Sequence, residues 1–378
     1  MKLKSKFPLM ETTIFSKIST LAVEYGAHNF GQGFPNFEPD PYLIERLDFH
    51  SKNKANQYAP MHGTQALRNS IQNLMSSLYK VTPDANSEIT ITSGATEALF
   101  CAISALVHLG DEVIVFDPSY DSYIPNIELN GGLAKRISLT DDYEIPWNLV
   151  AQNINEKTKC IILNSPHNPT GKVLTQKDLD QLWELIKDKN IYLISDEVYQ
   201  HIIFDNRKHI SPYLDKRMHE RTFSISSFGK TFHATGWKVG YCLGCEELTW
   251  EFRKIHQYIT FCTPQNLQLA ISDMLSAKLN QVQELGAFYQ EKRDQFQSYL
   301  KQSGLKLLPV EGSYFQVVDY QGISDLEDTD FAIELIKTKG FASIPLSVFY
   351  EIRPKTKRLR LCFAKTEDVL KEISKLQF

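Results

Sequence analysis

Short, almost uninterrupted apolar runs recur through the middle of the chain and alternate with longer segments of helical periodicity. The runs are rich in Val, Ile and Leu and lie at residues 89–92, 113–116, 160–163, 192–194, 223–226 and 239–243. The segments with helical spacing of apolar residues lie at 96–108, 176–189 and 266–285. Apolar strands that alternate with helices are typical of a largely parallel sheet covered on both faces. We therefore predict an α/β fold for this part of the chain.

The pattern changes toward both ends. Residues 287–302 combine helical periodicity with many charges, which predicts a long connecting helix. Beyond it, strands are predicted within 305–320, at 342–344 and at 358–363, with a helix from Asp330 and another after Thr366, a suitable N-cap. This mixture predicts a smaller α+β domain. Residues 1–30 predict an arm and a first helix, followed by the turn-rich GQGFPNF at 31–37.

Composition narrows the class of protein. A chain of 378 residues favours two domains, and 42% hydrophobic with 23% charged residues is ordinary for a globular enzyme. The net charge of −4 predicts no nucleic-acid and no membrane partner. The N-terminus lacks the features of a signal peptide, and no apolar run approaches the ~20 residues of a membrane span. Six cysteines without a dense framework suit a reducing cytosol, so a cytoplasmic location is expected.

The segments that carry chemistry follow the predicted strands. In chain order they are SGATEAL (93–99), DPSY (117–120), NSPHNPTG (164–171), SDEVY (195–199), SISSFGKT (224–231) and TGWKVGY (235–241). Ligands of open α/β sheets bind at the carboxyl ends of the strands. The placement of these segments therefore predicts a binding site at that edge.

Lys230 in SISSFGKT is the most informative residue. A hydroxyl three positions before a lysine, on a strand-end turn, suits an amine that bonds an aldehyde cofactor beside a phosphate group. Asp196 closes an apolar strand, where a carboxylate can keep a pyridine nitrogen protonated. Either residue alone would be an ordinary strand-end side chain. Together with the other segments they predict a site for pyridoxal phosphate.

The SGATEAL segment supplies a strand-to-helix junction at which the amides of Gly94, Ala95 and Thr96 can face a phosphate. It is neither G-x-G-x-x-G nor G-x-x-x-x-G-K, which argues against dinucleotide and nucleoside-triphosphate binding. Cys242 and Cys245 form a C-x-x-C pair, but no second pair has metal spacing, so both are expected to be structural and no metal is expected.

With these segments in this order, the chain resembles class I aminotransferases of fold type I, on the kynurenine/glutamine aminotransferase branch, and is most similar there to bacterial methionine aminotransferases. The resemblance implies a large domain with a mostly parallel seven-stranded sheet between helices and a smaller α+β domain. It also implies pyridoxal 5'-phosphate (PLP) as cofactor and a homodimer with shared active sites. The expected division is 1–45 (arm and first part of the small domain), 46–286 (large cofactor-binding domain) and 287–378 (connecting helix and rest of the small domain).

The resemblance implies a role for each residue of the predicted site. The catalytic residues would be Lys230, Asp196 and Tyr199, with Lys230 moving the proton. The ring of the cofactor would contact Tyr120, Asn168 and Tyr199. Its phosphate would contact Gly94, Ala95, Thr96, Ser227, Lys238 and, from the partner subunit, Tyr58. Lys238 stands where arginine is usual in the wider superfamily, and it offers a point charge without a bidentate fork.

On the substrate side, the resemblance favours Arg360 for the α-carboxylate, assisted by Gly33 and Asn168. Arg358 is two residues away and shares a strand face with Arg360, so spacing alone does not choose between them. Phe34, Phe261 and the Phe349–Tyr350 pair would form an apolar or aromatic wall. Residues 260–263 contain no arginine, so the carboxylate of a glutamate or aspartate side chain would lack its counter-charge.

The predicted activity is therefore amino transfer, by a ping-pong cycle, from an L-amino acid to a 2-oxo acid. Methionine is the favoured donor, with aromatic residues, glutamine, histidine or kynurenine as further candidates. The alternative is a cysteine-conjugate carbon–sulfur β-lyase, because both reactions begin by removing the same Cα proton. A regulator with an aminotransferase-like module is disfavoured, since the chain reaches GQGFPNF without an added DNA-binding region.

Overall fold

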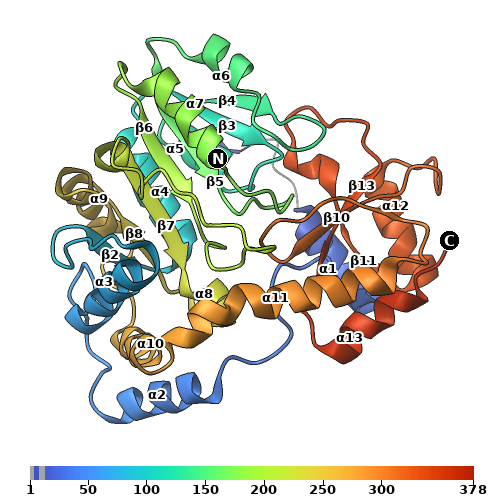
Figure 1. The fold of residues 1–378 in the computed structure, drawn as a ribbon, viewed down its shortest axis with the longest axis horizontal. Helices are drawn as coiled ribbons and strands as arrows, with labels where there is room; N and C mark the ends of the chain where they lie inside the picture. Colours follow the sequence, from blue (N-terminus) through green and yellow to red (C-terminus); the bar gives the residue numbers. More distant parts are fainter. Residues whose placement is uncertain (1–3, 8–12) are drawn as a thin grey trace.

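The computed structural model describes residues 4–7 and 13–378. The predicted N-terminal arm falls partly on residues 1–3 and 8–12, which lie outside the described residues. A larger body is built on one sheet, and a smaller body lies at one end of it (Figure 1). The long helix α11 (Leu279–Leu300) runs from the larger body along the smaller one (Figure 1).

The large sheet has seven strands in the order β2-β8-β7-β6-β5-β3-β4. Only β8 is antiparallel to its neighbours, so the predicted mostly parallel seven-stranded sheet is confirmed. All six predicted apolar runs are strands. Their bounds are β2 (Ile89–Thr92), β3 (Glu112–Asp117), β5 (Thr158–Asn164), β6 (Tyr192–Asp196), β7 (Thr222–Ser227) and β8 (Gly240–Leu243).

The seventh strand, β4 (Leu133–Ser138), was not predicted. It lies at the edge of the sheet and pairs only with β3, and only Ile137 of its six residues is buried. Edge strands are commonly polar, so this strand has no apolar run to find. Its Arg136 donates to Asp117 Oδ1 at 2.9 and 2.7 Å, which ties the edge to the end of β3.

Helices cover both faces of the large sheet. Successive residues of a buried strand point to opposite faces, so each strand contributes to a cluster on either side. In β3, Val113 and Val115 join one hydrophobic cluster, whereas Ile114 and Phe116 join another. The first cluster includes residues of α4 (Gly94–Leu106), α5 (Tyr123–Leu129) and α9 (Glu246–Ile259). The second includes residues of α6 (Trp147–Asn153) and α7 (Gln176–Ile186). A third cluster joins β2 and β8 to α2 (Pro41–Lys52), α3 (Gln65–Tyr79) and α10 (Gln265–Ala277).

The single helix predicted over 266–285 is wrong, because the chain breaks at Lys278 between α10 and α11. The backbone of Lys278 leaves the helical region (φ −134°), and its ammonium donates to both carboxylate oxygens of Asp40 at 2.7 Å. Asp40 is the N-cap of α2, so the break joins the end of α10 to the start of α2. The connecting helix accordingly begins at Leu279, earlier than expected.

The smaller body has a four-stranded antiparallel sheet in the order β12-β13-β10-β9. These strands are β9 (Lys306–Leu307), β10 (Phe315–Asp319), β12 (Ile344–Pro345) and β13 (Arg358–Cys362), accompanied by α12 (Asp328–Glu334) and α13 (Glu367–Glu372). The strand predicted at 342–344 is in fact two short strands. One of them, β11 (Phe341–Ala342), pairs with β1 (His28–Asn29) instead of this sheet.

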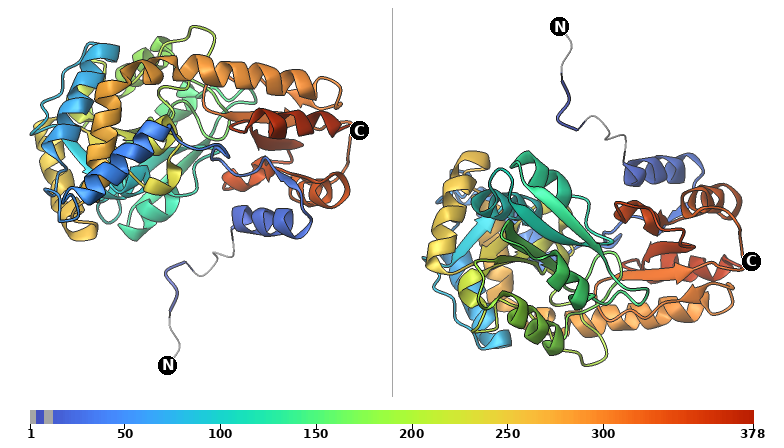
Figure 2. Two further views of the ribbon diagram at one scale, coloured as in Figure 1. Left: turned by 90° about the horizontal axis from the view of Figure 1, so that it is seen from below. Right: turned by 90° about the horizontal axis from the view of Figure 1, so that it is seen from above.

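The N-terminal segment packs with the C-terminal one. Helix α1 (Ile14–Glu24) lies beside the C-terminal elements in both views of Figure 2, and Ile18 and Phe30 share a hydrophobic cluster with Phe341. This sharing favours the proposed division into 1–45, 46–286 and 287–378, although the last boundary falls inside the continuous helix α11. Within the described ranges, no helix has the length and apolar character needed to cross a bilayer.

Candidate active site

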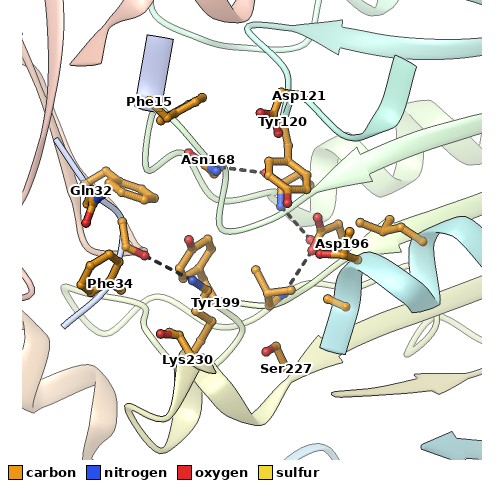
Figure 3. Close-up of a pocket in the computed structure, with 18 of the residues that line it drawn as sticks. Phe15, Gln32, Phe34, Tyr120, Asp121, Asn168, Asp196, Tyr199, Ser227 and Lys230 are labelled. Carbon is orange, nitrogen blue, oxygen red and sulfur yellow. Dashed lines mark hydrogen bonds between the residues drawn. The ribbon is translucent and has the colours of Figure 1, made fainter. Parts of the chain in front are cut away.

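A cavity of about 450 Å³ lies at the carboxyl ends of the central strands and reaches residues of the smaller body. Asn164, Asp196 and Ser227, the last residues of β5, β6 and β7, all line it. Tyr120 and Asp121 lie across the cavity from Ser227 and Lys230, and Phe15, Gln32 and Phe34 lie along another side (Figure 3). The cavity is therefore at the edge of the sheet that the sequence indicated.

Most residues of the predicted site line this one cavity. They are Gly33, Phe34, Ala95, Thr96, Tyr120, Asn168, Asp196, Tyr199, Ser227, Lys230, Lys238 and Arg360. Gly94 is not in this set, but it lies next to the side chain of Lys238, which lines the cavity. Tyr58 and Phe261 are not among its lining residues.

Lys230 lies on the short helix α8 (Phe228–Thr231) directly after β7. Its Nζ donates to the hydroxyl of Tyr314 at 2.9 Å and to the carbonyl oxygen of Gly33 at 3.3 Å. Burial lowers the pKa of Lys230 to about 8, and the positive charges of Lys238 and Arg360 also lower it. The amine is therefore neutral in a substantial fraction of molecules near pH 7–8, as a nucleophile and proton carrier requires.

Asp196 is buried at the end of β6. The hydroxyl of Tyr123 donates to its Oδ2 at 2.6 Å, and the Val198 amide donates to Oδ1 at 3.4 Å. Burial raises the pKa of Asp196 to about 6, while the Tyr123 hydrogen bond opposes the rise. The carboxylate is thus mostly ionised at neutral pH and suited to pair with a protonated ring nitrogen.

The first turn of α4 and Lys238 form a cradle for an anion. Gly94 begins the helix at φ +75°, and a Cβ there would meet Lys238 Cε at 3.2 Å and Nζ at 3.3 Å. The ammonium of Lys238 therefore lies close to the helix N-terminus, where a side chain at position 94 would crowd it. Free amides, the helix dipole and a cation together favour a phosphate dianion.

Arg360 on β13 enters the cavity and is fixed in place. Its Nη1 donates to Asn168 Oδ1 at 2.8 Å and its Nη2 donates to Gly31 O at 2.9 Å. Its buried Nε has no hydrogen-bond partner among the described residues. The guanidinium also lies 4.0 Å from the centroid of the Phe315 ring. A buried guanidinium with unused donor capacity suits a carboxylate ligand.

Arg358 lies outside the cavity, which favours Arg360 in the choice left open by spacing. Its Nη1 donates to Tyr143 Oη at 2.9 Å and to Asp141 O at 3.1 Å, and it is not among the residues that line the cavity. Of the two arginines, Arg360 alone lines the cavity.

Tyr58 and Phe261 lie together outside the cavity. Their ring centroids are 5.5 Å apart in an edge-to-face arrangement, and Tyr58 is 83% exposed. The prediction that Phe261 contacts substrate is therefore not met by a single subunit. The segment after α9 carries Phe261 to the surface beside Tyr58, the residue expected to act across a dimer interface.

Several residues that line the cavity, or that contact the residues lining it, were missed by sequence reasoning. Tyr123 and Asn164 stand within or beside quoted segments, and Asn164 Nδ2 donates to the Asp196 carbonyl at 2.9 Å, so their positions were available signals. Gln32 stands beside Gly33 in the quoted segment GQGFPNF, whereas Phe15 and Tyr314 belong to no segment that signals this chemistry. They reach Lys230 or the cavity only through the fold.

Among the described residues, one group of side chains is close enough to hold a metal ion, formed by Glu97, Cys101 and His256. His256 Nδ1 lies 2.5 Å from Glu97 Oε1, and its Nε2 lies 2.8 Å from the Met61 carbonyl oxygen. Both ring nitrogens are therefore already engaged with protein atoms. Cys242 and Cys245 do not belong to this group.

The chain matches the family model described as aminotransferase class I and II over residues 27–375. It therefore belongs to the class I and II aminotransferase family, and it is an aminotransferase. Enzymes of this family depend on PLP in general. The predicted resemblance and the fold-type I class are confirmed.

The relatives agree with this assignment. A methionine aminotransferase of Escherichia coli is 48% identical over 368 residues, which cover 97% of this chain and 95% of the relative. A solved Escherichia coli structure identified as a methionine aminotransferase has a TM-score of 0.98 and 47% identity, and the match covers 100% of this chain and 99% of that one. A kynurenine–oxoglutarate transaminase of Dictyostelium discoideum is 34% identical, and the match covers 89% of this chain and 86% of the relative. The names of these relatives do not favour the β-lyase alternative.

Proposed function

We propose that this chain transfers the amino group of L-methionine to a 2-oxo acid, with PLP bound at Lys230, and acts as a homodimer. The observation that carries the proposal is the gathering of a partly buried amine, a buried acid and a buried guanidinium in one cavity. The preference for methionine is supported by the 48% identity to the methionine aminotransferase of Escherichia coli.

The residues of the cavity fit the cofactor. The cradle at Gly94 and Lys238 suits its phosphate, and the guanidinium of Arg360 uses only two of its five N–H groups in bonds from Nη1 and Nη2, which leaves donors for a substrate carboxylate. When bound, PLP supplies an aldehyde and an electron-withdrawing ring. In the proposed arrangement Gly94, Ala95, Thr96, Ser227 and Lys238 hold the phosphate. Tyr120, Asn168, Asp196 and Tyr199 hold the ring, and Lys230 holds the aldehyde carbon.

The side chains then divide the work of the reaction. Arg360 binds the α-carboxylate of the amino acid, and its bond to Asn168 Oδ1 turns the Asn168 amide so that Nδ2 is left to donate. Lys230, whose pKa is about 8, accepts the Cα proton of the substrate and returns it at another carbon. Asp196 stays ionised under its hydrogen bond from Tyr123.

The lining of the cavity favours an uncharged side chain. Its cations are Lys230, Lys238 and Arg360, and each already has a proposed role. A carboxylate on the substrate side chain would remain unpaired there, at a cost of several kcal/mol. Phe15 and Phe34 offer aromatic surfaces, with which a thioether makes favourable contacts. Aromatic amino acids, glutamine, histidine and kynurenine remain proposed further donors.

The homodimer and the cytoplasmic location are parts of the proposal. The exposed pair of Tyr58 and Phe261 supports an interface through which Tyr58 reaches the partner's phosphate. All six cysteines are free, which suits a reducing compartment.

The proposal is tested by the absorption spectrum and by a screen of amino donors. Wild-type protein mixed with PLP is expected to show the visible band of the lysine-bound cofactor, and Lys230→Ala is expected to lose it. Methionine should discharge this band faster than glutamate or aspartate and yield the matching 2-oxo acid. An unchanged spectrum in Lys230→Ala contradicts the site. Release of pyruvate and ammonia from a cysteine conjugate without any oxo acid would instead favour the lyase.

A further inference from the structure

Tyr314 contacts the amine of Lys230 but has no part in the proposed function. Its hydroxyl lies 2.9 Å from Lys230 Nζ and 2.5 Å from the carbonyl oxygen of Gly33. A carbonyl oxygen only accepts hydrogen bonds, so the Tyr314 proton must point to Gly33. The lone pairs of the hydroxyl are then left to accept from Lys230.

We propose that Tyr314 is a positioning residue that holds the amine of Lys230 in the orientation needed for proton transfer. The inference rests on the proposed role of Lys230 as the base of the aminotransferase reaction.

The number of hydrogens on the amine limits the direction of its lone pair. A neutral lysine has two N–H groups and one lone pair. Tyr314 Oη and Gly33 O accept one N–H each, at 2.9 and 3.3 Å. The lone pair must therefore point away from both oxygens, and Lys230 lines the cavity. Without the hydroxyl, only the longer contact to Gly33 would orient the amine.

The hydroxyl itself is held rigidly. Tyr314 is fully buried, and its ring packs edge-to-face on Tyr199 and tilted on Tyr289, with centroids 5.0 and 5.7 Å away. Gly33 packs closely on Phe315, because a Cβ there would lie 2.7 Å from Cζ of that ring. Two well-placed acceptors therefore meet the amine, which reduces the conformational freedom that Lys230 must lose before it reacts.

The hydroxyl also affects the charge of the amine. Groups that face Lys230 include the charged Asp196, Lys238 and Arg360, the thiol of Cys362 and the phenols of Tyr199 and Tyr314. An acceptor stabilises the ammonium form more than the amine, so the Tyr314 hydroxyl works against the burial that lowers the pKa. Its loss should therefore lower the pKa of Lys230 further.

The test uses Tyr314→Phe, which removes the hydroxyl and keeps the ring. Tyr289→Phe is a matched control, because its buried hydroxyl has no hydrogen-bond partner within the described part of the chain and does not line the cavity. Each holoenzyme is converted by excess methionine to its pyridoxamine form, in which Lys230 is free. The rate at which acetic anhydride labels Lys230 is then measured across pH by mass spectrometry of the labelled peptide.

For Tyr314→Phe, the labelling midpoint should fall by about one pH unit relative to wild type. Its kcat should fall roughly 10- to 100-fold, with KM for methionine little changed. Tyr289→Phe should match wild type in both measurements. If Tyr314→Phe does not fold, Tyr314→Leu removes the same hydroxyl and replaces it in the test.

The result separates the two proposals. A hydroxyl-free variant with the labelling midpoint and kcat of wild type overturns the role of Tyr314, while a wild-type protein that transaminates methionine keeps the proposed function. A wild-type protein that neither binds PLP at Lys230 nor transaminates overturns the proposed function, and the role of Tyr314 with it.

Discussion

The hydroxyl of Tyr123 donates a 2.6 Å hydrogen bond to Oδ2 of Asp196, and both side chains are buried. The bond runs from the start of α5 to the end of β6, where Asp196 lines the cavity. Because the hydrogen bond stabilises the ionised carboxylate, it holds the pKa of Asp196 lower than burial alone would set it.

Tyr123→Phe should therefore raise the pKa of Asp196 above its value of about 6, by about one pH unit. A larger share of Asp196 is then neutral at a given pH, so the loss of PLP affinity on acidification should begin at higher pH. The measurement is the dissociation constant of PLP between pH 5 and 8, together with the acid limb of kcat/KM.

Tyr213→Phe serves as the control, because Tyr213 is buried, does not line the cavity and has a hydroxyl without a partner among the described residues. It should leave both pH curves in place. A downward shift in Tyr123→Phe, or none, would contradict the assigned role of the hydrogen bond.

The two arginines of β13 give the second prediction. Arg360→Lys keeps a positive charge but removes the planar pair of donors and the bonds to Asn168 and Gly31. It should lower kcat/KM for methionine roughly 30- to 200-fold, which corresponds to about 2–3 kcal/mol. Arg358→Lys should leave kcat/KM within about threefold of wild type, since Arg358 bonds Tyr143 and Asp141 away from the cavity. Equal losses in the two variants would contradict the assignment of Arg360.

The parts of the fold that the sequence predicted are those whose cause is local. Buried strands such as β5 and β6 are apolar on both faces and so appear as continuous runs. Strand β4 lacks such a run because it lies at the edge of the sheet. At the break, Lys278 bonds Asp40, which lies 238 positions away in the chain. A local sequence pattern does not predict a contact between residues so far apart.

The same division applies to the site. Lys230, Asp196 and Asn168 follow strands in recognisable segments, so their meeting at one sheet edge could be predicted from the order of the elements. Tyr314 and Phe15 reach the site from the smaller body and the N-terminal helix, and their contacts depend on how the two bodies pack. Phe261 shows the opposite case, in which a residue with a predicted role lies outside the cavity of its own subunit.

A stability prediction comes from the buried pair of Glu97 and His256. The His256 ring bridges Glu97 Oε1 and the Met61 carbonyl, while the other oxygen of Glu97 accepts from the Ser93 amide. Each His256 nitrogen faces an acceptor, so a proton must lie between the two side chains. His256→Ala leaves Glu97 buried without its partner and should lower the free energy of unfolding by about 3 kcal/mol or more.

Urea unfolding of the variant with and without PLP measures this loss. The control is His108→Ala, which removes a histidine whose side chain is 79% exposed and lies 3.7 Å from Asp111. An exposed pair of this kind contributes at most about 1 kcal/mol, so the control should unfold near wild type. If the two variants were equally stable, the Glu97–His256 pair would not be holding α9 to the start of α4.

The proposed donation of Tyr58 to the partner's site gives the sharpest prediction, because two inactive proteins should become active when mixed. Tyr58 is 83% exposed and lies outside the cavity of its own subunit, whereas Lys230 lines that cavity. In a hybrid of Lys230→Ala with Tyr58→Ala, one site would combine an intact Lys230 with an intact Tyr58 from the partner. When equal amounts of the two variants exchange subunits at random, half of the dimers are hybrid, and each hybrid has one intact site of two. Activity should therefore return to about one quarter of wild type.

The control mixes Lys230→Ala with Asp196→Ala. Both of these residues line one cavity, so every site stays damaged and no activity should return. Recovery in the control, or none in the first mixture, would contradict donation of Tyr58 across the interface.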